Sequence, residues 1–126
     1  DFKIDEWRVI TTAHILKKGL KKFNADDYEN ALKLFNILVN YDKNDVNALF
    51  YGGVCCVNLG MSDQAIEYLD NVLQNENSSF SEEAKWYKTL AYVKKKDFVT
   101  AKKLLNEIIL ENGFYAAQAK EKLKEI

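Results

Sequence analysis

Apolar residues recur along most of the chain at helical spacing, in pairs of bursts that short polar segments divide. The dividing segments read NADD (24–27), GMSD (60–63) and KKD (95–97). A helical burst, a tight polar turn and a second helical burst together predict a helical hairpin. The pattern therefore predicts three hairpins in succession.

Five polar side chains are placed to cap these predicted helices. An Asp or Ser at the N-cap accepts a hydrogen bond from a backbone N–H that the helix leaves unpaired. Ser79 also has Glu82 three residues later, which is a capping-box pattern. We expect Asp27, Ser62 and Asp97 to cap the second helices of the hairpins, and Asp45 and Ser79 to cap the first helices of the last two.

The hairpins repeat at a fixed interval. Gly19 and Ala31 fall 34 residues before Gly53 and Ala65. In the third copy the offset is 36, because the segment SSFS (78–81) adds two residues to the connection. Such a period is typical of proteins in which each repeat is one supersecondary unit that buries its apolar face against its neighbours.

Composition and charge narrow the class of protein further. The chain has 126 residues with no proline and five glycines, which favours an all-helical fold. Lys and Arg number 18 against 19 Asp and Glu, so the electrostatic case for nucleic acid or for an anionic membrane is absent. No apolar run approaches the roughly 18 residues of a membrane span, and no signal peptide is visible. Because the sequence begins at Asp1, we expect a fragment or a processed form.

A 34-residue helix–turn–helix with a small residue at position 8 and alanine at position 20 resembles the tetratricopeptide repeat. The second copy also has Phe50 at position 5, Gly60 at the interhelix turn, and leucines at positions 24 and 28. The proline that the family has near position 32 is absent from every copy. The resemblance implies an all-α solenoid: a single domain (1–126) with an N-terminal extension (1–11), repeats at 12–45, 46–79 and 82–112, and a C-terminal capping helix (114–126).

Segments at both ends are expected to cover the repeats. Residues 114–126 predict an amphipathic helix, and Gly113 before them suits a helix C-cap. Residues 1–11 either lengthen the first helix or cross a surface, with Trp7, Val9 and Ile10 as apolar side chains to bury.

The segment FYGGVCCVNLG (50–60) raises the question of a phosphate, metal or redox site. Gly53 holds the small-residue position where two helices touch, and no Gly-x-x-x-x-Gly-Lys pattern accompanies it. Cys55 and Cys56 lie within one predicted helix, where neighbouring side chains point about 100° apart, so a disulfide would distort it. We interpret them as packed free thiols rather than as a redox pair or metal ligands.

No catalytic arrangement is visible in the sequence. His14 is the only histidine, and no CxxC pair, HExxH helix or glycine-rich phosphate loop appears. We therefore predict a protein that is not an enzyme, with no catalytic residues, no cofactor and no metal. The lysine clusters at 17–22 and 94–96 are diluted by acids and are more typical of solvated helix faces than of RNA binding.

The resemblance also implies where a partner binds. In tetratricopeptide proteins the first helices of successive hairpins line a concave groove. A tryptophan and two tyrosines at groove positions have the composition of a binding hot spot. Glu83, which occupies a position that grips a carboxylate in chaperone-binding relatives, argues against chaperone C-termini as ligands. The implied groove residues are Leu16, Lys17, Leu20, Phe50, Tyr51, Val54, Trp86, Tyr87 and Leu90.

The sequence therefore predicts a scaffold for protein–protein interaction that binds a peptide or protein segment in an aromatic and apolar groove. The alternative is an assembly domain whose groove is filled by its own N-terminal segment, a neighbouring domain or a second copy, so a homo-oligomer stays open. A weaker resemblance, carried by EAKWY (83–87) and LAY (90–92), is to repeat modules that follow a membrane anchor in bacterial envelope proteins. The compartment is therefore cytoplasmic, or extracytoplasmic on an anchor outside this sequence; two unpaired cysteines argue against the latter.

Overall fold

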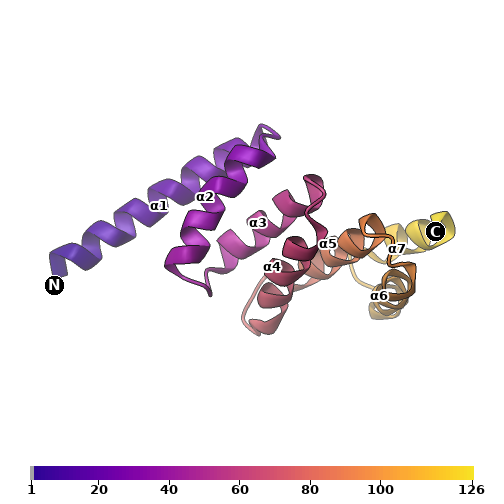
Figure 1. Ribbon diagram of the computed structural model, residues 1–126. Helices are drawn as coiled ribbons and strands as arrows, with labels where there is room; N and C mark the ends of the chain where they lie inside the picture. Colours follow the sequence, from indigo (N-terminus) through magenta and orange to yellow (C-terminus); the bar gives the residue numbers. More distant parts are fainter. Residues whose placement is uncertain (1) are drawn as a thin grey trace.

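Figure 1 shows a computed structural model of the chain, in which helices follow one another along an extended stack. The structure describes residues 2–126, and of residues 2–5 and 8 only the backbone. Within that range the regular structure is entirely helical, as the sequence predicts. None of these helices is both long enough and apolar enough to span a membrane. The helices are α1 (Phe2–Asn24), α2 (Tyr28–Tyr41), α3 (Val46–Asn58), α4 (Ser62–Gln74), α5 (Ser81–Lys94), α6 (Phe98–Glu111) and α7 (Ala116–Glu125).

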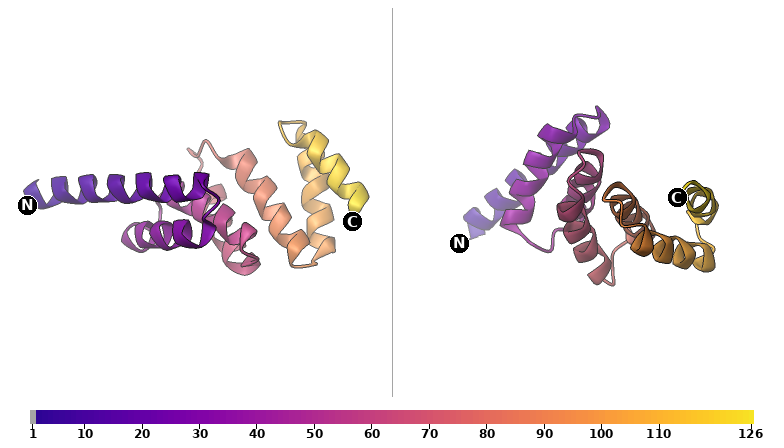
Figure 2. Two further views of the ribbon diagram at one scale, coloured as in Figure 1. Left: turned by 90° about the horizontal axis from the view of Figure 1, so that it is seen from above. Right: turned by 45° about the vertical axis from the view of Figure 1, so that its right-hand side comes forward.

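The helices pack as three hairpins. α1 packs on α2, α3 on α4 and α5 on α6, while α2 contacts α3 and α4 contacts α5 to join the hairpins. α7 packs on α6 and covers the C-terminal end of the stack (Figure 2). The predicted solenoid of three tetratricopeptide-like hairpins with a capping helix is confirmed.

The turn inside each hairpin has the same backbone conformation. Asp26, Gly60 and Lys96 have left-handed φ values of 59°, 76° and 66°, and they are separated by the same offsets of 34 and 36 residues that relate the repeats. Glycine adopts this conformation without the steric penalty that a Cβ atom brings. The repeat is therefore present in the backbone as well as in the side-chain pattern.

Small residues allow the two helices of each hairpin to touch. A Cβ atom on Gly19 would lie 2.8 Å from the Phe35 ring, and one on Gly53 would lie 2.8 Å from Cγ and Cδ2 of Leu69. Thr89 takes this position in the third hairpin, is fully buried, and donates its hydroxyl proton to the carbonyl one turn earlier at 2.8 Å. The role predicted for Gly53 is confirmed.

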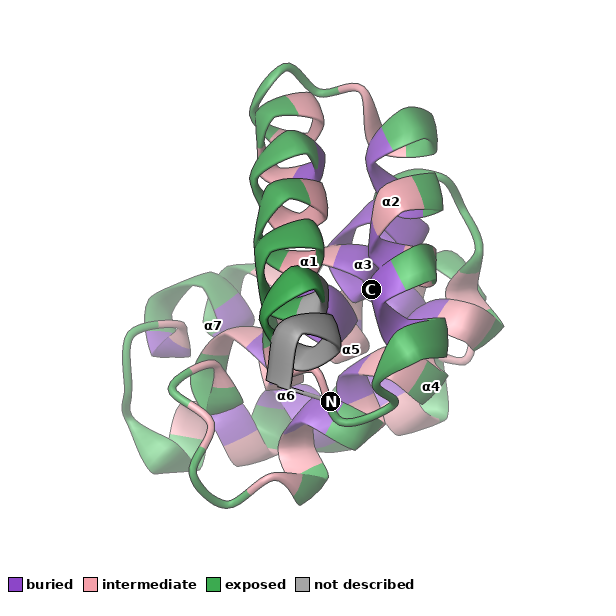
Figure 3. Ribbon diagram, turned by 90° about the vertical axis from the view of Figure 1, so that its left-hand side faces the viewer, coloured by how far each residue is buried: buried purple, intermediate pink, exposed green. Residues whose placement is uncertain are grey.

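Burial is concentrated on the middle hairpin. α3 is buried along nearly its whole length, from Ala48 to Val57, because α2, α4 and α5 all pack against it. Figure 3 shows this contrast, with α3 buried and the outer side of α1 exposed. A smaller apolar cluster between α6 and α7 contains Leu105, Ile108 and Ala119.

The three aspartates cap helices as predicted. Asp27, Asp45 and Asp97 each accept a hydrogen bond from the backbone N–H three residues later, at 3.4, 3.2 and 3.1 Å. The predictions for the two serines are wrong. Met61 is the N-cap of α4, since it occupies the repeat position of Asp27 and Asp97, and Ser62 comes one residue too late.

The second serine and the predicted C-cap glycine are corrected in the same way. The longer connection before α5 moves its N-cap from Ser79 to Phe80, so the capping box with Glu82 does not form. Glu82 instead accepts a hydrogen bond from the Phe114 backbone N–H at 3.3 Å. At the end of α6 the left-handed C-cap is Asn112, with φ 52°, rather than Gly113.

The N-terminal extension lengthens the first helix. α1 has 23 residues against 14 in α2, and its N-terminal turns project beyond α2 (Figures 1 and 2). Trp7, Val9 and Ile10 are 71%, 67% and 62% exposed, so the prediction that they are buried is wrong. α2 is too short to reach them. The same geometry shows that residues 6–11 do not fold back over the repeats, because they continue α1 outward.

Candidate protein-binding face

The first helices of the three hairpins lie next to one another, because α1 contacts α3 and α3 contacts α5. We call the surface that they share the first-helix face. Each helix supplies three of the predicted groove residues: Leu16, Lys17 and Leu20 on α1, Phe50, Tyr51 and Val54 on α3, and Trp86, Tyr87 and Leu90 on α5. Their exposure differs from helix to helix, and this difference decides where a partner can make contact.

The α1 part of the face is open. Leu16 and Leu20 are half-buried against the core, while Lys17 is exposed. These side chains border a shallow, wide-open hollow of about 530 Å³ that is lined by residues of α1 alone. Its floor is apolar and its rim carries amino groups. The lining residues are Ala13, Leu16, Lys17, Leu20, Lys21 and Asn24.

The α3 part of the face is mostly core. Phe50 is 6% exposed and Val54 is 3% exposed, so both offer a partner little contact area. The ring of Phe80, from the connection before α5, lies parallel to the Phe50 ring with centroids 4.4 Å apart. Tyr51 is half-buried and meets the Phe23 ring edge-on at 5.2 Å. Of the three predicted residues on α3, Tyr51 is the accessible one.

The α5 part of the face is half-buried and aromatic. Tyr87 meets the Phe50 ring edge-on, with centroids 6.1 Å apart. Trp86 is stacked on Tyr115, which precedes α7, at 5.4 Å and an interplanar angle of 12°. Leu90 is also half-buried. The capping segment therefore completes this end of the face.

Sequence reasoning missed both Phe80 and Tyr115. Each comes from a connection between helices rather than from a groove position of the repeat. The sequence did contain one indication of Phe80: the connection before α5 is two residues longer than in the other repeats. An apolar residue in such an insertion next to a groove is expected to pack against it. No sequence signal pairs Tyr115 with Trp86, because their contact depends on how α7 docks.

Most polar groups near the face have local partners. Lys94 donates from Nζ to the Val57 carbonyl at 2.8 Å and so satisfies an oxygen at the C-terminal end of α3. Asn58 donates from Nδ2 to the Val54 carbonyl at 3.0 Å. The Lys94 contact joins the C-terminal end of α3 to α5, and the Asn58 contact lies within α3.

The two cysteines are fully buried free thiols, as interpreted from the sequence. Burial raises the pKa of Cys55 to about 12, with a smaller contribution from Cys56, and burial raises the pKa of Cys56 to about 11. A thiol is nucleophilic and binds metals as the thiolate. At neutral pH both side chains therefore act as small apolar residues in the core.

His14 is exposed on α1, whereas the two thiols are buried in α3. Within the described side chains, no group of three His, Cys, Asp or Glu residues is arranged to hold a metal ion. The chemistry that the first-helix face presents is apolar and aromatic contact, bordered by lysines and by one carboxylate, Glu83.

Solved structures of other proteins share this fold. The type III secretion translocator chaperone SycD of Yersinia enterocolitica superposes with a TM-score of 0.77 at 17% identity, over 93% of this chain and 83% of that chain. An alternative dimer of the same chaperone gives 0.75 at 17% identity, over 91% and 90%. PcrH, in complex with the chaperone-binding region of PopD, gives 0.77 at 17% identity, over 91% and 90%. No protein-family model and no curated protein sequence matches the chain.

These comparisons define a class by fold. The chain has the tetratricopeptide-like helical fold of these chaperones, at an identity that establishes the architecture alone.

Proposed function

We propose that the chain is a non-enzymatic tetratricopeptide-type scaffold that binds a peptide or protein segment along the first-helix face. The observation that carries the proposal is the open, apolar hollow on α1, which neither α2 nor the N-terminal turns of α1 cover. Covering apolar side chains that are exposed to water lowers the free energy of the complex.

The shape of the face suits a segment rather than a compact small molecule. From the hollow on α1, the accessible positions continue through Tyr51 to Tyr87 and Leu90 on α5. Phe50 and Val54 form the buried floor between them. Tyrosine rings contribute contact area, and their hydroxyls can bond to a peptide backbone. The structure of PcrH with the chaperone-binding region of PopD supports this proposal by analogy of fold.

The proposal is tested by selecting binders from a random peptide library displayed on phage, with the domain immobilised. Ala13 lines the hollow and is exposed, so Ala13→Glu places a charged side chain in it without removing core contacts. Ala117 is an exposed alanine on α7, and Ala117→Glu is the matched control. We expect selected peptides to lose at least about tenfold in affinity with Ala13→Glu and to be unaffected by Ala117→Glu. Equal binding to both variants would contradict the proposal.

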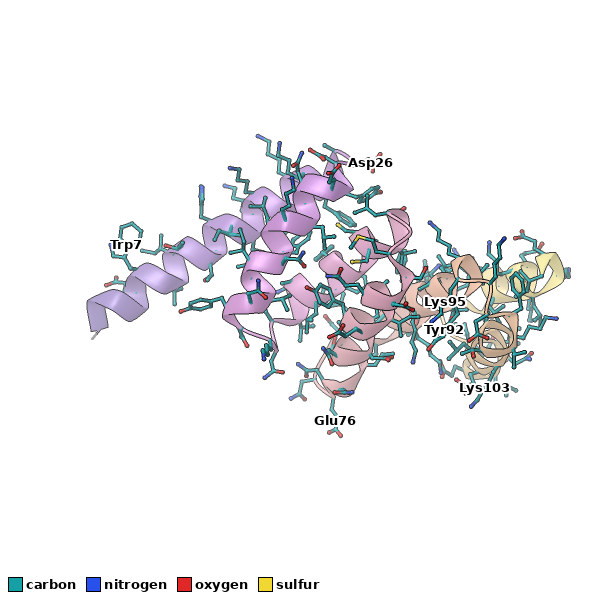
Figure 4. The ribbon with its side chains drawn as sticks, viewed as in Figure 1. Trp7, Asp26, Glu76, Tyr92, Lys95 and Lys103 are labelled. Atoms are coloured by element: carbon teal, nitrogen blue, oxygen red, sulfur yellow. The ribbon has the colours of Figure 1, made fainter. Side chains whose placement is uncertain are left out.

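Exposed apolar residues on the projecting part of α1 favour a second candidate function, self-association. Figure 4 shows Trp7 standing clear of the other helices. Glu6 is exposed near the N-terminal end of α1, and Lys17 and Lys21 are exposed near its C-terminal end. Two α1 helices packed antiparallel would bury these apolar side chains and bring Glu6 of each copy toward the lysines of the other. Such a dimer would cover the hollow, so it competes with peptide binding.

The second candidate is tested by light scattering after size exclusion. Ile10→Glu places a charge on the projecting turns of α1, and Val99→Glu does the same at an exposed aliphatic residue of α6. A dimer that Ile10→Glu separates and Val99→Glu leaves intact would support self-association. A wild-type monomer at concentrations above about 100 μM would contradict it. At such concentrations a dimer forms only if burying the two apolar faces contributes more free energy than the loss of translational and rotational freedom costs.

A further inference from the structure

The charged side chains in the first turns of α5 have partners, with one exception. Lys85 forms ion pairs with two glutamates of α6, at 3.3 and 2.5 Å. Lys88 forms an ion pair with an aspartate of α4 at 2.7 Å. Glu82 accepts a hydrogen bond from the backbone N–H of Phe114. Glu83 has no ion pair with any residue that the structure describes.

Glu83 also has a buried oxygen without a hydrogen bond. Its Oε2 atom is removed from water and has no partner among the described residues. The side chain as a whole is only partly buried, so an incoming group can approach the carboxylate. A carboxylate that has lost part of its hydration without gaining a hydrogen-bond donor is unfavourable. A cation beside it would offset the lost solvation free energy.

Two aromatic side chains share the helix face of this carboxylate, and a third stacks on one of them. Trp86 and Tyr87 follow Glu83 at the i+3 and i+4 positions, which share one face of a helix. Tyr115 stacks on Trp86. The pKa of Tyr115 is raised, first by burial and then by the nearby Tyr87, Glu83 and Glu82, which agrees with a position close to the carboxylate.

A favourable place for Glu83 at the N-terminal end of α5 is not a sufficient explanation. Negative charge in a first helical turn is stabilised by the helix dipole, and Glu82 in the same turn already has that benefit together with a hydrogen bond. The dipole does not account for an oxygen that is buried without a donor. A group that brings positive charge or N–H donors would satisfy this oxygen.

We propose that Glu83, Trp86, Tyr87 and Tyr115 form a subsite for a cationic side chain, Lys or Arg, of the segment that binds the first-helix face. The carboxylate supplies the charge, and the faces of the aromatic rings attract the cation as well. The subsite lies at the end of the face formed by α5 and the segment before α7. This inference rests on the proposed function, and it adds a preference for a basic residue at one end of the bound segment.

The test uses N-acetylarginine amide as the probe and N-acetylcitrulline amide as its uncharged counterpart, at matched ionic strength. Heteronuclear NMR follows the two indole N–H signals, of which Trp86 reports on the subsite and Trp7 is an internal control at the far end of α1. We expect the arginine probe to shift the Trp86 signal in a saturable way and the citrulline probe to bind at least about tenfold more weakly. Trp7 should not respond.

Glu83→Gln removes the charge and keeps the shape, and Glu76→Gln, at an exposed acid in the connection before α5, is the matched control. We expect Glu83→Gln to weaken the arginine probe about tenfold and Glu76→Gln to leave its affinity within about twofold. Both variants should keep the wild-type amide spectrum outside the substituted region. The proposal is overturned if Trp86 does not respond to the arginine probe, or if Glu83→Gln binds it as tightly as wild type.

The phage selection separates this inference from the proposed function. Peptides that bind wild type and Glu83→Gln equally, without enrichment of Arg or Lys, would remove the subsite and leave the segment-binding proposal intact. A saturable arginine response together with no effect of Ala13→Glu on peptide binding would leave the subsite and remove the proposed mode of binding on α1.

Discussion

The two adjacent glycines of α3 allow a sharp test of how the hairpins pack. Gly52 and Gly53 are both buried in the same helix, and replacement by alanine would add the same methyl group to each. In a helix interior, alanine is favoured over glycine by about 1 kcal/mol. The two substitutions therefore share one favourable term and differ only in what the new methyl group meets.

At Gly53 the methyl carbon would lie 2.8 Å from both Cγ and Cδ2 of Leu69, a side chain that is fully buried in the core. Overpacking of this kind costs about 1–3 kcal/mol, and a clash with a branch carbon belongs in the upper half of that range. After the gain in helix propensity, Gly53→Ala should reduce the free energy of unfolding by about 1–2 kcal/mol.

At Gly52 the nearest atoms are those of the Tyr68 ring at 3.2 Å, which a shift of a few tenths of an ångström relieves. Gly52→Ala should therefore stay within about 1 kcal/mol of wild type. Urea unfolding followed by circular dichroism measures both variants. The reasoning is refuted if Gly53→Ala is as stable as wild type, or if Gly52→Ala is the less stable of the two.

A double-mutant cycle tests the cause directly. Leu69→Ala on its own should cost about 2–5 kcal/mol, because it leaves a cavity in the core. It also removes the atoms that the new methyl group would strike. In that background Gly53→Ala should stabilise the protein by about 1 kcal/mol, which reverses the sign of its effect in wild type. An unchanged sign would mean that the clash with Leu69 is not the reason for the glycine.

Three further predictions concern the turns, the caps and the thiols. Lys96→Gly should stabilise the protein by roughly 0.5–1 kcal/mol in urea unfolding, and Gly60→Ala should destabilise it by about 1 kcal/mol, because both residues have a left-handed φ. A clash cannot be the cause at Gly60, since no atom lies within 4 Å of a Cβ placed there. Variants as stable as wild type would contradict this reasoning. Hydrogen bonds from Thr100 lower the pKa of Asp97, so its stabilising contribution should be complete above the ordinary Asp pKa of about 3.9 and be lost as the pH falls through the lower folded-state value. The difference between wild type and Asp97→Ala in urea midpoint should therefore shrink at acidic pH, and a difference that grows there would contradict the capping role. Because burial raises the pKa of Cys55 to about 12, a thiol reagent at pH 8 should label it only as fast as the domain opens, and rapid labelling without loss of structure would contradict its burial.

Features that depend on local spacing were predictable from the sequence. The 34-residue offset between Gly19 and Gly53 predicts the hairpins, since both glycines allow a close helix contact that the repeat requires. The aspartate caps were predictable because their positions are set by the turn just before the helix. The prediction for Ser62 was wrong because the left-handed turn at Gly60 places the N-cap at Met61, one residue earlier.

Features that depend on how distant segments meet were not predictable. The repeat pattern places Phe50 at a groove position, but the parallel ring of Phe80 from the next connection makes it part of the core. Trp7 is apolar and was expected to be buried, whereas the length of α2 leaves it exposed. The isolation of Glu83 emerges only when the partners of Lys85 and Lys88 are known, because a sequence does not say which charges pair.

The central claim is that a protein segment binds along α1, α3 and α5, and the most direct measurement is a map of amide chemical-shift changes on titration with a selected peptide. The account predicts that the perturbed amides cluster at Ala13, Leu16 and Leu20 and extend through Tyr51 to Tyr87 and Leu90. It predicts no perturbation at the exposed outer positions Val99 and Leu110 of α6. Perturbations confined to α2, α4 and α6 would contradict it, because the peptide would then bind the opposite side of the solenoid.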